Sequence, residues 1–168
     1  MDANRVGWMS NSSGETVRIM GWSGCDRFIF PSKLDVSDPT VTIQFKGQLP
    51  VTRWIEIIQT DGIISMAQTL DRVVDQPWEP LVSSSKPVTK YQSMKTTIWK
   101  TPSDDYPTSI WGYAFTPDSV CLPFHENDYP HSLGIPVYND EEEFVGLIVD
   151  TIMVDFIDGS KIHQVVFN

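Results

Sequence analysis

The expected fold is decided by the run VGLIVDTIMVDFI at residues 145–157, the pair Asp158-Gly159, and the run KIHQVVF at residues 161–167. Both runs are rich in apolar and β-branched residues. An Asp-Gly pair between two such runs is a common turn of a β-hairpin. We therefore expect an antiparallel hairpin in the C-terminal half, at the centre of a sheet that carries the other strands.

Six shorter segments upstream are typical of strands, because apolar and polar residues alternate or β-branched and aromatic residues dominate. They lie at residues 16–22, 27–30, 41–45, 52–58, 96–100 and 109–115. Twelve prolines divide the chain into short pieces. This pattern suits a β-rich fold with irregular connections.

One segment has the period of a helix. Its apolar residues follow the i, i+3, i+4 and i+7 spacing of a helix face, and they are Ile63, Met66, Ala67, Leu70, Val73 and Val74. Asp61 is placed to cap the helix start, and Pro77 closes the segment. We therefore expect a helix over residues 63–74. The stretches 78–95 and 116–143 are expected to be long loops, which are usually functional or mobile.

Size and charge limit the class of protein. The chain has 168 residues, enough for one domain with its own core. Its net charge is −10 and its basic residues are scattered, so we expect no direct binding to nucleic acid, which needs a basic face. The N-terminus has no apolar run of the kind found in signal peptides. Asn11-Ser12-Ser13 matches a glycosylation sequon, which we interpret as a loop.

Most motifs of enzymes and cofactor sites are absent from the sequence. There is no phosphate-binding glycine loop and no dinucleotide fingerprint, so no cofactor is expected. Cys25 and Cys121 fit no metal or redox spacing, and we expect reduced core thiols, with a disulfide as the alternative. A metal site at His125, Asp128 and His131 is a further alternative, although the nearby prolines disfavour helical ligand spacing.

The adjacent pair His131-Ser132 is the strongest catalytic candidate. A serine hydroxyl becomes a nucleophile when an imidazole accepts its proton and a carboxylate orients that imidazole. Adjacent residues of an extended strand point to opposite faces, so the two side chains can meet only if the backbone turns. Pro130 and Gly134 on either side are compatible with such a turn.

Asp150 is the preferred carboxylate of this hypothetical triad. It shares its parity in the 145–157 run with four apolar residues, Ile148, Ile152, Val154 and Phe156. An acid in a buried row needs a partner, and a histidine would supply one. Asp128, Asp140 and Asp155 are alternatives. The competing interpretation gives Asp150 a structural or surface role.

Histidines and aromatic residues leave two further interpretations open. His163 lies in the last expected strand, and all three histidines could titrate near pH 6 as an acid-triggered switch. Six tryptophans are more than one core usually needs. Trp78 and Tyr129 lie in proline-bearing stretches, where exposed aromatics anchor protein or glycan contacts. The alternative is that these rings pack loops onto the sheet.

Two N-terminal runs carry a resemblance to a known family. GETVRIMGW at residues 14–22 and DRFIFP at residues 26–31 resemble the C-terminal protrusion domain of iflavirus capsid proteins, the picorna-like insect viruses that include deformed wing virus. Such domains carry an Asp, a His and a Ser at an exposed crown, which resembles the active site of esterases. The resemblance places His131 and Ser132 in the base and nucleophile positions, with Asp150 as the third member.

The resemblance implies an α+β, β-rich fold, in which a smaller sheet and one or two helices flank a central antiparallel sheet. Residues 1–14 would be a linker from an upstream shell domain, and residues 15–168 would form one globular domain. The implied location is the virion surface after production in the host cytoplasm. The implied partners are other capsid proteins and a host receptor or membrane lipid.

Three functions follow as hypotheses. The first is a virion surface domain that acts in host-cell attachment or entry. The second, compatible with it, is ester or lipid hydrolysis by Ser132, His131 and Asp150. The third is a cytosolic β-rich binding domain without catalysis.

Overall fold

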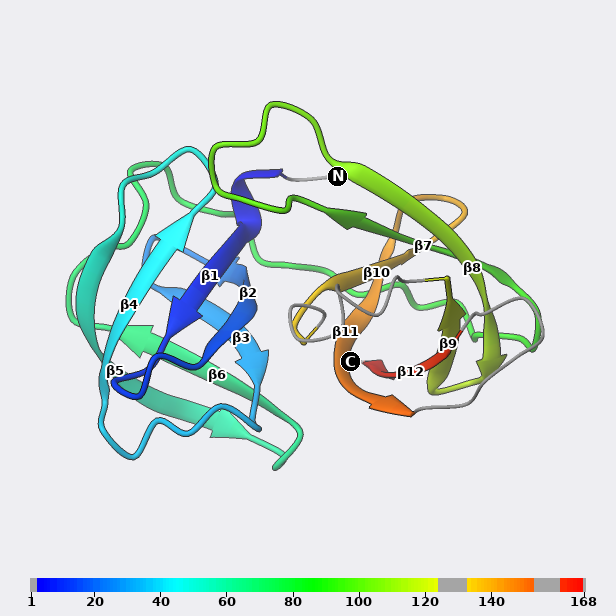
Figure 1. Cartoon of the computed structure of the whole chain (residues 1–168), viewed down its shortest axis with the longest axis horizontal. Helices are drawn as coiled ribbons and strands as arrows, with labels where there is room; N and C mark the ends of the chain where they lie inside the picture. The colour runs from blue at the N-terminus through cyan, green and yellow to red at the C-terminus, as the bar shows by residue number, and fades with distance from the viewer. Residues whose placement is uncertain (1–2, 124–132, 153–160, 168) are drawn as a thin grey trace. The chain divides into compact units, whose positions relative to one another are not determined.

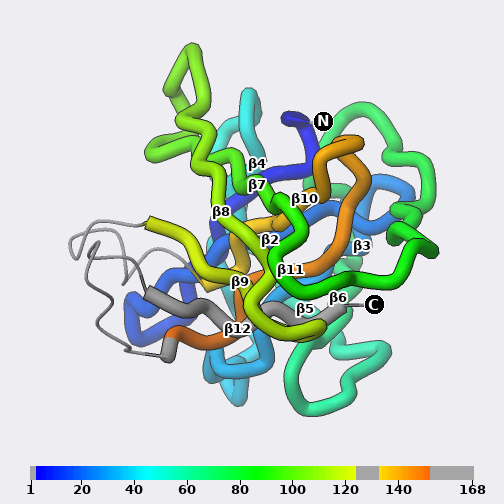
Figure 2. The backbone as a smooth tube through the Cα atoms, turned by 90° about the vertical axis from the view of Figure 1, so that its right-hand side faces the viewer, coloured from blue at the N-terminus to red at the C-terminus, as the bar shows by residue number. Residues whose placement is uncertain are grey.

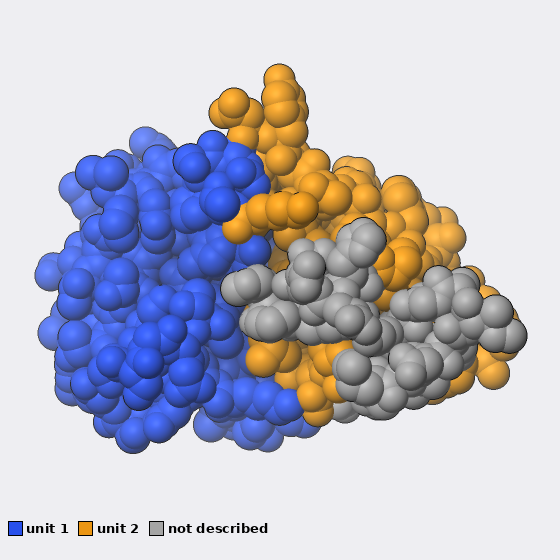
Figure 3. All heavy atoms as spheres, in the orientation of Figure 1, with its two compact units in different colours: residues 1–81, 101–104 blue, residues 82–100, 105–168 orange. Residues whose placement is uncertain are grey.

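The computed structural model describes residues 3–123, 133–152 and 161–167. The chain divides into two compact units, residues 1–81 with 101–104 and residues 82–100 with 105–168 (Figure 3). No helix among the described residues is long and apolar enough to cross a membrane.

The first unit contains a closed barrel of six antiparallel strands (Figure 1). The strands are β1 (Val6–Ser10), β2 (Thr16–Ser23), β3 (Arg27–Pro31), β4 (Thr40–Phe45), β5 (Val51–Thr60) and β6 (Ile64–Thr69), preceded by a short 3-10 helix, η1 (Ala3–Arg5). Their order around the barrel is β1-β2-β3-β6-β5-β4, and β4 pairs with β1 to close it. Alternating residues of the strands point inward, which explains the alternating pattern at residues 41–45.

Aromatic side chains fill part of this first barrel. Phe28 lies edge-on to Phe45, with 6.1 Å between the ring centroids, and Phe45 lies 4.7 Å from Trp78. Trp78 is buried, and its indole Nε1 donates a hydrogen bond of 3.1 Å to the carbonyl of Asn4. Of the two interpretations of Trp78, the one in which it packs the chain is therefore the one observed.

The segment expected as an N-terminal linker contains β1, which pairs with β2 and β4. The turn after β1 is organised by Asn11, whose side-chain Oδ1 accepts hydrogen bonds from the amides of Ser13 (3.1 Å) and Glu15 (2.9 Å). Its Nδ2 donates to the Glu15 carboxylate (3.1 Å) and to the carbonyl of Asp35 (2.9 Å). The amide of the sequon is thus buried and occupied by hydrogen bonds inside the protein.

The helix predicted over residues 63–74 is wrong. β6 occupies Ile64–Thr69 and pairs with β3 and β5, with Ser65, Ala67 and Thr69 buried and Leu70 82% exposed. The predicted helix face is not the buried face, because Ile63 and Leu70 are 45% and 82% exposed. Hydrogen bonding to two barrel neighbours, β3 and β5, outweighs the local helical period. Asp61 caps a hairpin turn: its carboxylate accepts 2.8 Å hydrogen bonds from two amides, those of residues 63 and 64.

The signal for this hairpin was in the sequence. Asp61-Gly62 is an Asp-Gly pair between two β-rich runs, the same pattern that predicted the C-terminal hairpin. Gly62 adopts a φ of 86°, a left-handed conformation that favours glycine. The pair therefore marks a turn between β5 and β6.

The second unit contains another closed antiparallel barrel (Figures 1 and 2). Its strands are β7 (Ser93–Ile98), β8 (Thr108–Thr116), β9 (Ser119–Leu122), β10 (Pro136–Asn139), β11 (Phe144–Ile152) and β12 (Lys161–Phe167). They follow the order β10-β11-β12-β9-β8-β7, and β7 pairs with β10 to close the ring. The predicted antiparallel pairing of the two C-terminal runs is confirmed by β11 and β12, whereas the expected turn at Asp158-Gly159 lies outside the described residues.

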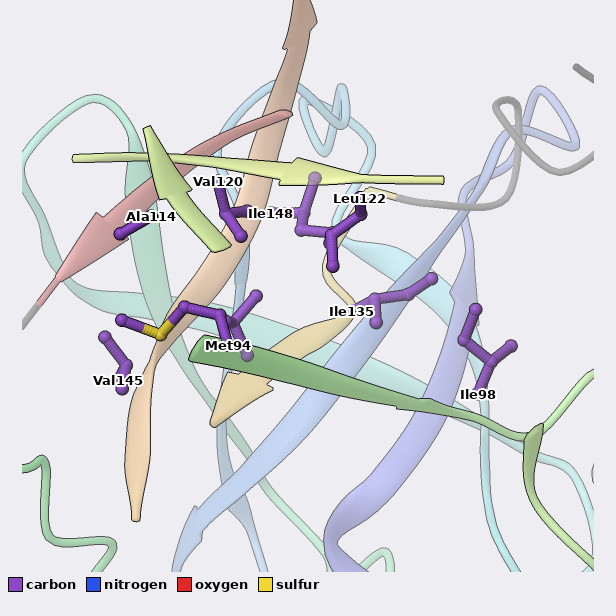
Figure 4. Packing of buried hydrophobic residues seen from close by; sticks show 9 residues of the cluster. Met94, Ile98, Ala114, Val120, Leu122, Ile135, Val145 and Ile148 are labelled. Carbon is purple, nitrogen blue, oxygen red and sulfur yellow. The ribbon is translucent and has the colours of Figure 1, made fainter. Parts of the chain in front are cut away.

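The core of the second barrel is aliphatic. Figure 4 shows the cluster, whose members come from five strands and from the segment before β10; they are Met94, Ile98, Ala114, Val120, Leu122, Ile135, Val137, Val145 and Ile148. Two of its strands, β9 and β10, lie within residues 116–143, a stretch expected to be a long loop. Both strands are only four residues long, too short to show a clear alternation of polar and apolar residues.

The fold class is therefore all-β, with two barrels. The expected α+β arrangement of a central sheet, a smaller sheet and one or two helices is wrong, because the strands of each unit close into a ring and the described residues contain no α-helix. Cys25 and Cys121 are free thiols; Cys121 is buried, whereas Cys25 is partly exposed. The expectation of reduced thiols is confirmed for both cysteines, whereas the expected core position is correct for Cys121 alone.

Candidate ligand-binding surface

The structure does not test the predicted triad of His131, Ser132 and Asp150. His131 and Ser132 lie outside the described residues, as do the alternative carboxylates Asp128 and Asp155. Asp140 is exposed at the start of the turn after β10. The triad therefore stays a prediction from the sequence.

Asp150 lies in β11, where a β-bulge interrupts the expected apolar row. The pairing of β11 with β12 shifts between Ile148, opposite Val165, and Asp150, opposite Gln164. A bulge changes which face the following residues occupy. Ile148 is fully buried, whereas Asp150 is only partly buried, and its Oδ1 accepts a 2.8 Å hydrogen bond from the amide of Thr151.

Metal binding finds no support in the part of the chain that the structure describes. No group of three His, Cys, Asp or Glu side chains is placed to hold an ion there. The alternative site at His125, Asp128 and His131 lies outside the described residues, as does Tyr129. The side chain of His163 is likewise not described, although its backbone pairs with Thr151.

Two buried arginines of the first barrel have structural roles. Arg5 donates hydrogen bonds to the carbonyls of Gly21 (3.0 Å) and Trp22 (3.2 Å). Arg18 lies opposite Trp8, with its guanidinium carbon 4.8 Å from the ring centroid. Burial lowers the pKa of Arg18 to about 10, against the opposing effect of nearby Asp104. Both side chains are enclosed, so neither forms an accessible site.

A row of aromatic side chains follows β8 in the second barrel. Trp111, Tyr113 and Phe115 occupy alternate positions, and alternate residues of a strand share one face. Ala114 is fully buried in the core, so Trp111 and Tyr113 lie on the outer face. Phe115 lies at a bulge in the pairing of β8 with β9, and its ring is near the same group because Lys90 contacts both Phe115 and Tyr91. Trp111 is 53% exposed and the other two are half-buried. The tyrosine ring of Tyr91 adds to the row, with its centroid 5.9 Å from that of Tyr113.

Two lysines lie against these rings. The Lys90 ammonium lies 5.1 Å from the centroid of Tyr91 and 5.8 Å from that of Phe115. The Lys95 ammonium lies 5.3 Å from the Trp111 centroid, and the two residues are directly paired across β7 and β8. Cation–π contacts of this kind hold both the ring and the cation in place. We call the six residues Lys90, Tyr91, Lys95, Trp111, Tyr113 and Phe115 the aromatic surface.

Of the two non-glycine residues described with positive φ, one belongs to the aromatic surface and the other contacts it. Tyr91 has a φ of 66° and Glu142 a φ of 61°. Tyr91 is part of the surface, and the Glu142 carboxylate accepts a 2.7 Å hydrogen bond from Lys95. A left-handed backbone at a residue other than glycine is unfavourable and tends to occur at binding and switch sites. This strain is an observation independent of the exposed rings.

The turn that contains Glu142 is acidic and firmly held. Asn139 is buried and its Oδ1 accepts 3.0 Å hydrogen bonds from the amides of Glu141 and Glu143. Lys86 contacts the carboxylates of Glu141 and Glu143. A hydrogen bond from Lys95 lowers the pKa of Glu142, and one from Asn139 lowers that of Glu143. The turn therefore positions Lys95 from one side while Trp111 positions it from the other.

The sequence carried a partial signal for this surface. The strand at residues 109–115 was predicted, and alternation within it separates Trp111, Tyr113 and Phe115 from the apolar residues of the opposite face. Sequence reasoning placed exposed aromatics at Trp78 and Tyr129 instead. The pairing of β8 with β7 and β9 decides which of its faces points outward. Residue types alone do not specify this pairing.

Comparison with solved structures identifies the double-barrel arrangement. The chain is similar to the Rv3671c protease of M. tuberculosis in an inactive form, with a TM-score of 0.67, 11% identity, and coverage of 98% of this chain and 84% of that one. It is also similar to the MamO protease domain of Magnetospirillum magneticum, with a TM-score of 0.65 and 11% identity, covering 98% of this chain and 92% of that one. A human pathogenic astrovirus serine protease gives a TM-score of 0.64 at 11% identity, covering 99% of this chain and 91% of that chain.

These likenesses show the fold, which is that of the chymotrypsin-like serine proteases. No family model and no curated protein matches the sequence. The resemblance to an iflavirus protrusion domain is therefore wrong, and so are the attachment and esterase functions inferred with it. The short runs at residues 14–22 and 26–31 form β2 and β3 of the first barrel. The expected partners and location stay predictions.

Proposed function

We propose that this chain is a protease-like domain that does not cleave peptides and that binds a ligand through its aromatic surface. The observation that carries the proposal is the line of partly exposed rings on β8, which two lysines contact and which has one left-handed residue within the surface, Tyr91, and one beside it, Glu142. Aromatic side chains in such positions contribute a large share of binding energy at protein surfaces.

The positions of the histidines argue against proteolysis. In chymotrypsin-type enzymes the triad residues follow one another along the chain in the order His, Asp, Ser, with the imidazole as general base. In this chain all three histidines come at position 125 or later, so the first barrel contains no imidazole. Only Ser132 and Ser160 follow the first histidine. A base from the first barrel is therefore missing.

The aromatic surface fits a binding role better than a purely structural one. Rings that serve only to fill a core are enclosed, as Phe28 and Phe45 are in the first barrel. Trp111 and Tyr91 remain 53% and 66% exposed, and yet their positions are fixed by neighbouring side chains. A rigid, exposed aromatic group loses little conformational entropy when a ligand binds.

Two measurements test this proposal. The purified chain is incubated with denatured casein and with a fluorophosphonate probe, beside a Ser132→Ala variant. We expect no cleavage and no labelling by either protein. Turnover or labelling that disappears in Ser132→Ala would show an active serine and overturn the non-catalytic assignment. Ligand binding is tested separately, by calorimetric titration of the chain with peptides.

A further inference from the structure

We infer that the aromatic surface binds an extended, proline-rich peptide that carries an acidic residue. The inference rests on the proposed binding function and specifies its ligand. It combines three features of the second barrel. Both edges of β8 are already paired, the three rings on β8 cover a defined length, and only one of the two lysines is paired with a carboxylate.

A peptide cannot join this part of the barrel as an added strand. β8 pairs on one side with β7 and on the other with β9, so its backbone groups are already used. Strand addition requires an unpaired edge. An extended ligand on the outer face must therefore be recognised by side chains. The polyproline II conformation suits this mode, because it has no internal hydrogen bonds and is commonly bound by aromatic-lined surfaces.

The row of rings matches a short peptide in length. Residues 111 to 115 of a strand span about 13 Å, and a polyproline II chain rises about 3.1 Å per residue. Four to five ligand residues, roughly, would thus cover the three rings. The indole Nε1 of Trp111 is a hydrogen-bond donor, and the carbonyls of a polyproline II chain are free to accept. The conformation is also preformed, which reduces the entropy lost on binding.

The two lysines differ in their electrostatic state. Lys95 is paired with the Glu142 carboxylate, so its charge is compensated within the protein. Lys90 is exposed, and within the described residues it contacts rings but no carboxylate. An acidic ligand residue beside the prolines would complement this charge.

A nucleic-acid strand fits the same rings less well. Stacking platforms for single strands combine aromatics with a positively charged groove. The second unit, residues 82–100 and 105–168, contains eleven acidic residues, five lysines and no arginine. A chain of phosphates would meet net repulsion there.

The test uses the full chain and the probe acetyl-PPPPPPDP-amide, titrated by isothermal calorimetry. Control ligands are the same peptide with Lys for Asp, a Gly-Ser peptide of equal length, and an oligothymidylate. We expect saturable binding of the acidic proline peptide. Trp111→Ala should weaken it at least about tenfold, and Lys90→Gln about threefold, with the Lys90→Gln effect absent for the peptide that has Lys in place of Asp.

Trp54→Ala is the matched control, because Trp54 is also 53% exposed but lies on β5 of the first barrel. It should leave binding unchanged, and circular dichroism checks that each variant is folded. Binding of the oligothymidylate alone, if lost in Trp111→Ala, would overturn the peptide inference while retaining the binding surface. Failure of all four ligands, or equal binding by Trp111→Ala, would overturn the inference and count against the binding function.

Discussion

The turn at Asn11 in the first barrel and the turn at Asn139 in the second have the same construction. In each, the asparagine Oδ1 accepts hydrogen bonds from the amides two and four residues later. In each, its Nδ2 donates to the carboxylate of the glutamate four residues later, at 3.1 Å for Glu15 and 3.0 Å for Glu143. The backbone amide of the asparagine also donates to that glutamate's carbonyl in both turns.

The two turns differ in the residue that adopts the left-handed conformation. It is Gly14 in the first turn, with a φ of 83°, and Glu142 in the second, with a φ of 61°. Glycine adopts this conformation without steric penalty, whereas glutamate does not. The side chain of Glu142 bonds to Lys95 beside Trp111. The comparison indicates that the second turn accepts backbone strain in order to place a side chain at the aromatic surface.

The largest expected effect comes from removing the asparagines. Asn11→Ala and Asn139→Ala should each destabilise their own barrel by about 2–3 kcal/mol, because two backbone amides and a carboxylate lose buried partners. Native-state hydrogen exchange, measured in the barrel that contains each turn, gives the local free energy. Equal losses support the equivalence of the turns. If one variant loses local stability and the other does not, the two turns are not equivalent.

A smaller effect is expected at the left-handed position. Gly14→Ala should destabilise the first barrel by about 1 kcal/mol, since an added Cβ would meet only open space and the backbone conformation alone is unfavourable. Glu142→Gly should raise the unfolding temperature by about 2 °C while weakening peptide binding. Both melting temperatures can be read by calorimetry. A lower melting temperature for Glu142→Gly would mean that the Lys95 contact outweighs the strain.

Acid should affect the second turn through its carboxylates. The pKa values of Glu142 and Glu143 lie below their ordinary value of 4.5 in the folded protein, because Lys95 and Asn139 donate hydrogen bonds to them. Their contribution to stability is therefore complete above pH 4.5 and is lost as the pH falls through the lowered values. The melting temperature should fall below this pH.

The double variant Glu142→Gln, Glu143→Gln is the control for the acid effect. Its melting temperature should depend less on pH in the same window, because these two carboxylates no longer take up protons on unfolding. The pH dependence of the melting temperature that remains in the double variant should come in part from the first barrel. There, hydrogen bonds from Ser37 and from the amide of Ile64 lower the pKa values of Asp35 and Asp61, respectively. If the melting temperatures of the unmodified chain and the double variant depend equally on pH, the carboxylates of this turn do not contribute to the acid effect.

Local patterns predicted most strands but not how they pair. Residues 16–22 and 41–45 show their strand character in alternation alone, and the apolar runs at 145–157 and 161–167 contain the paired strands β11 and β12. Barrel closure depends on contacts between distant segments, such as β7 with β10, which no local pattern encodes. The helix predicted at residues 63–74 failed for the same reason: two neighbouring strands overrode the local period.

The candidate site was harder to predict than the strands. Asp150 shares a face with Ile148 only if the strand is uninterrupted. The bulge after Ile148 breaks this alternation, so the sequence pattern does not predict where the Asp150 side chain lies. Alternation groups Trp111 with Tyr113 and Phe115 on one face of a strand but does not indicate which face is exposed. The exposure of the Trp111 side chain follows from the pairing of β8 with β7 and β9, which turns this residue away from the core. Strain at Glu142 is a property of the folded backbone, and the residue type itself gives no warning of it.

The position of β12 also has a consequence for synthesis of the chain on the ribosome. β12 follows all other strands of the described residues, and it pairs with both β9 and β11. The first barrel has all six strands once residue 69 is made, whereas β9 and β11 keep an unpaired edge until residues 161–167 emerge. Exposed strand edges are prone to aggregate. Newly made chains should therefore need protection by chaperones until residues 161–167 have left the ribosome, and chains truncated before residue 161 should be insoluble.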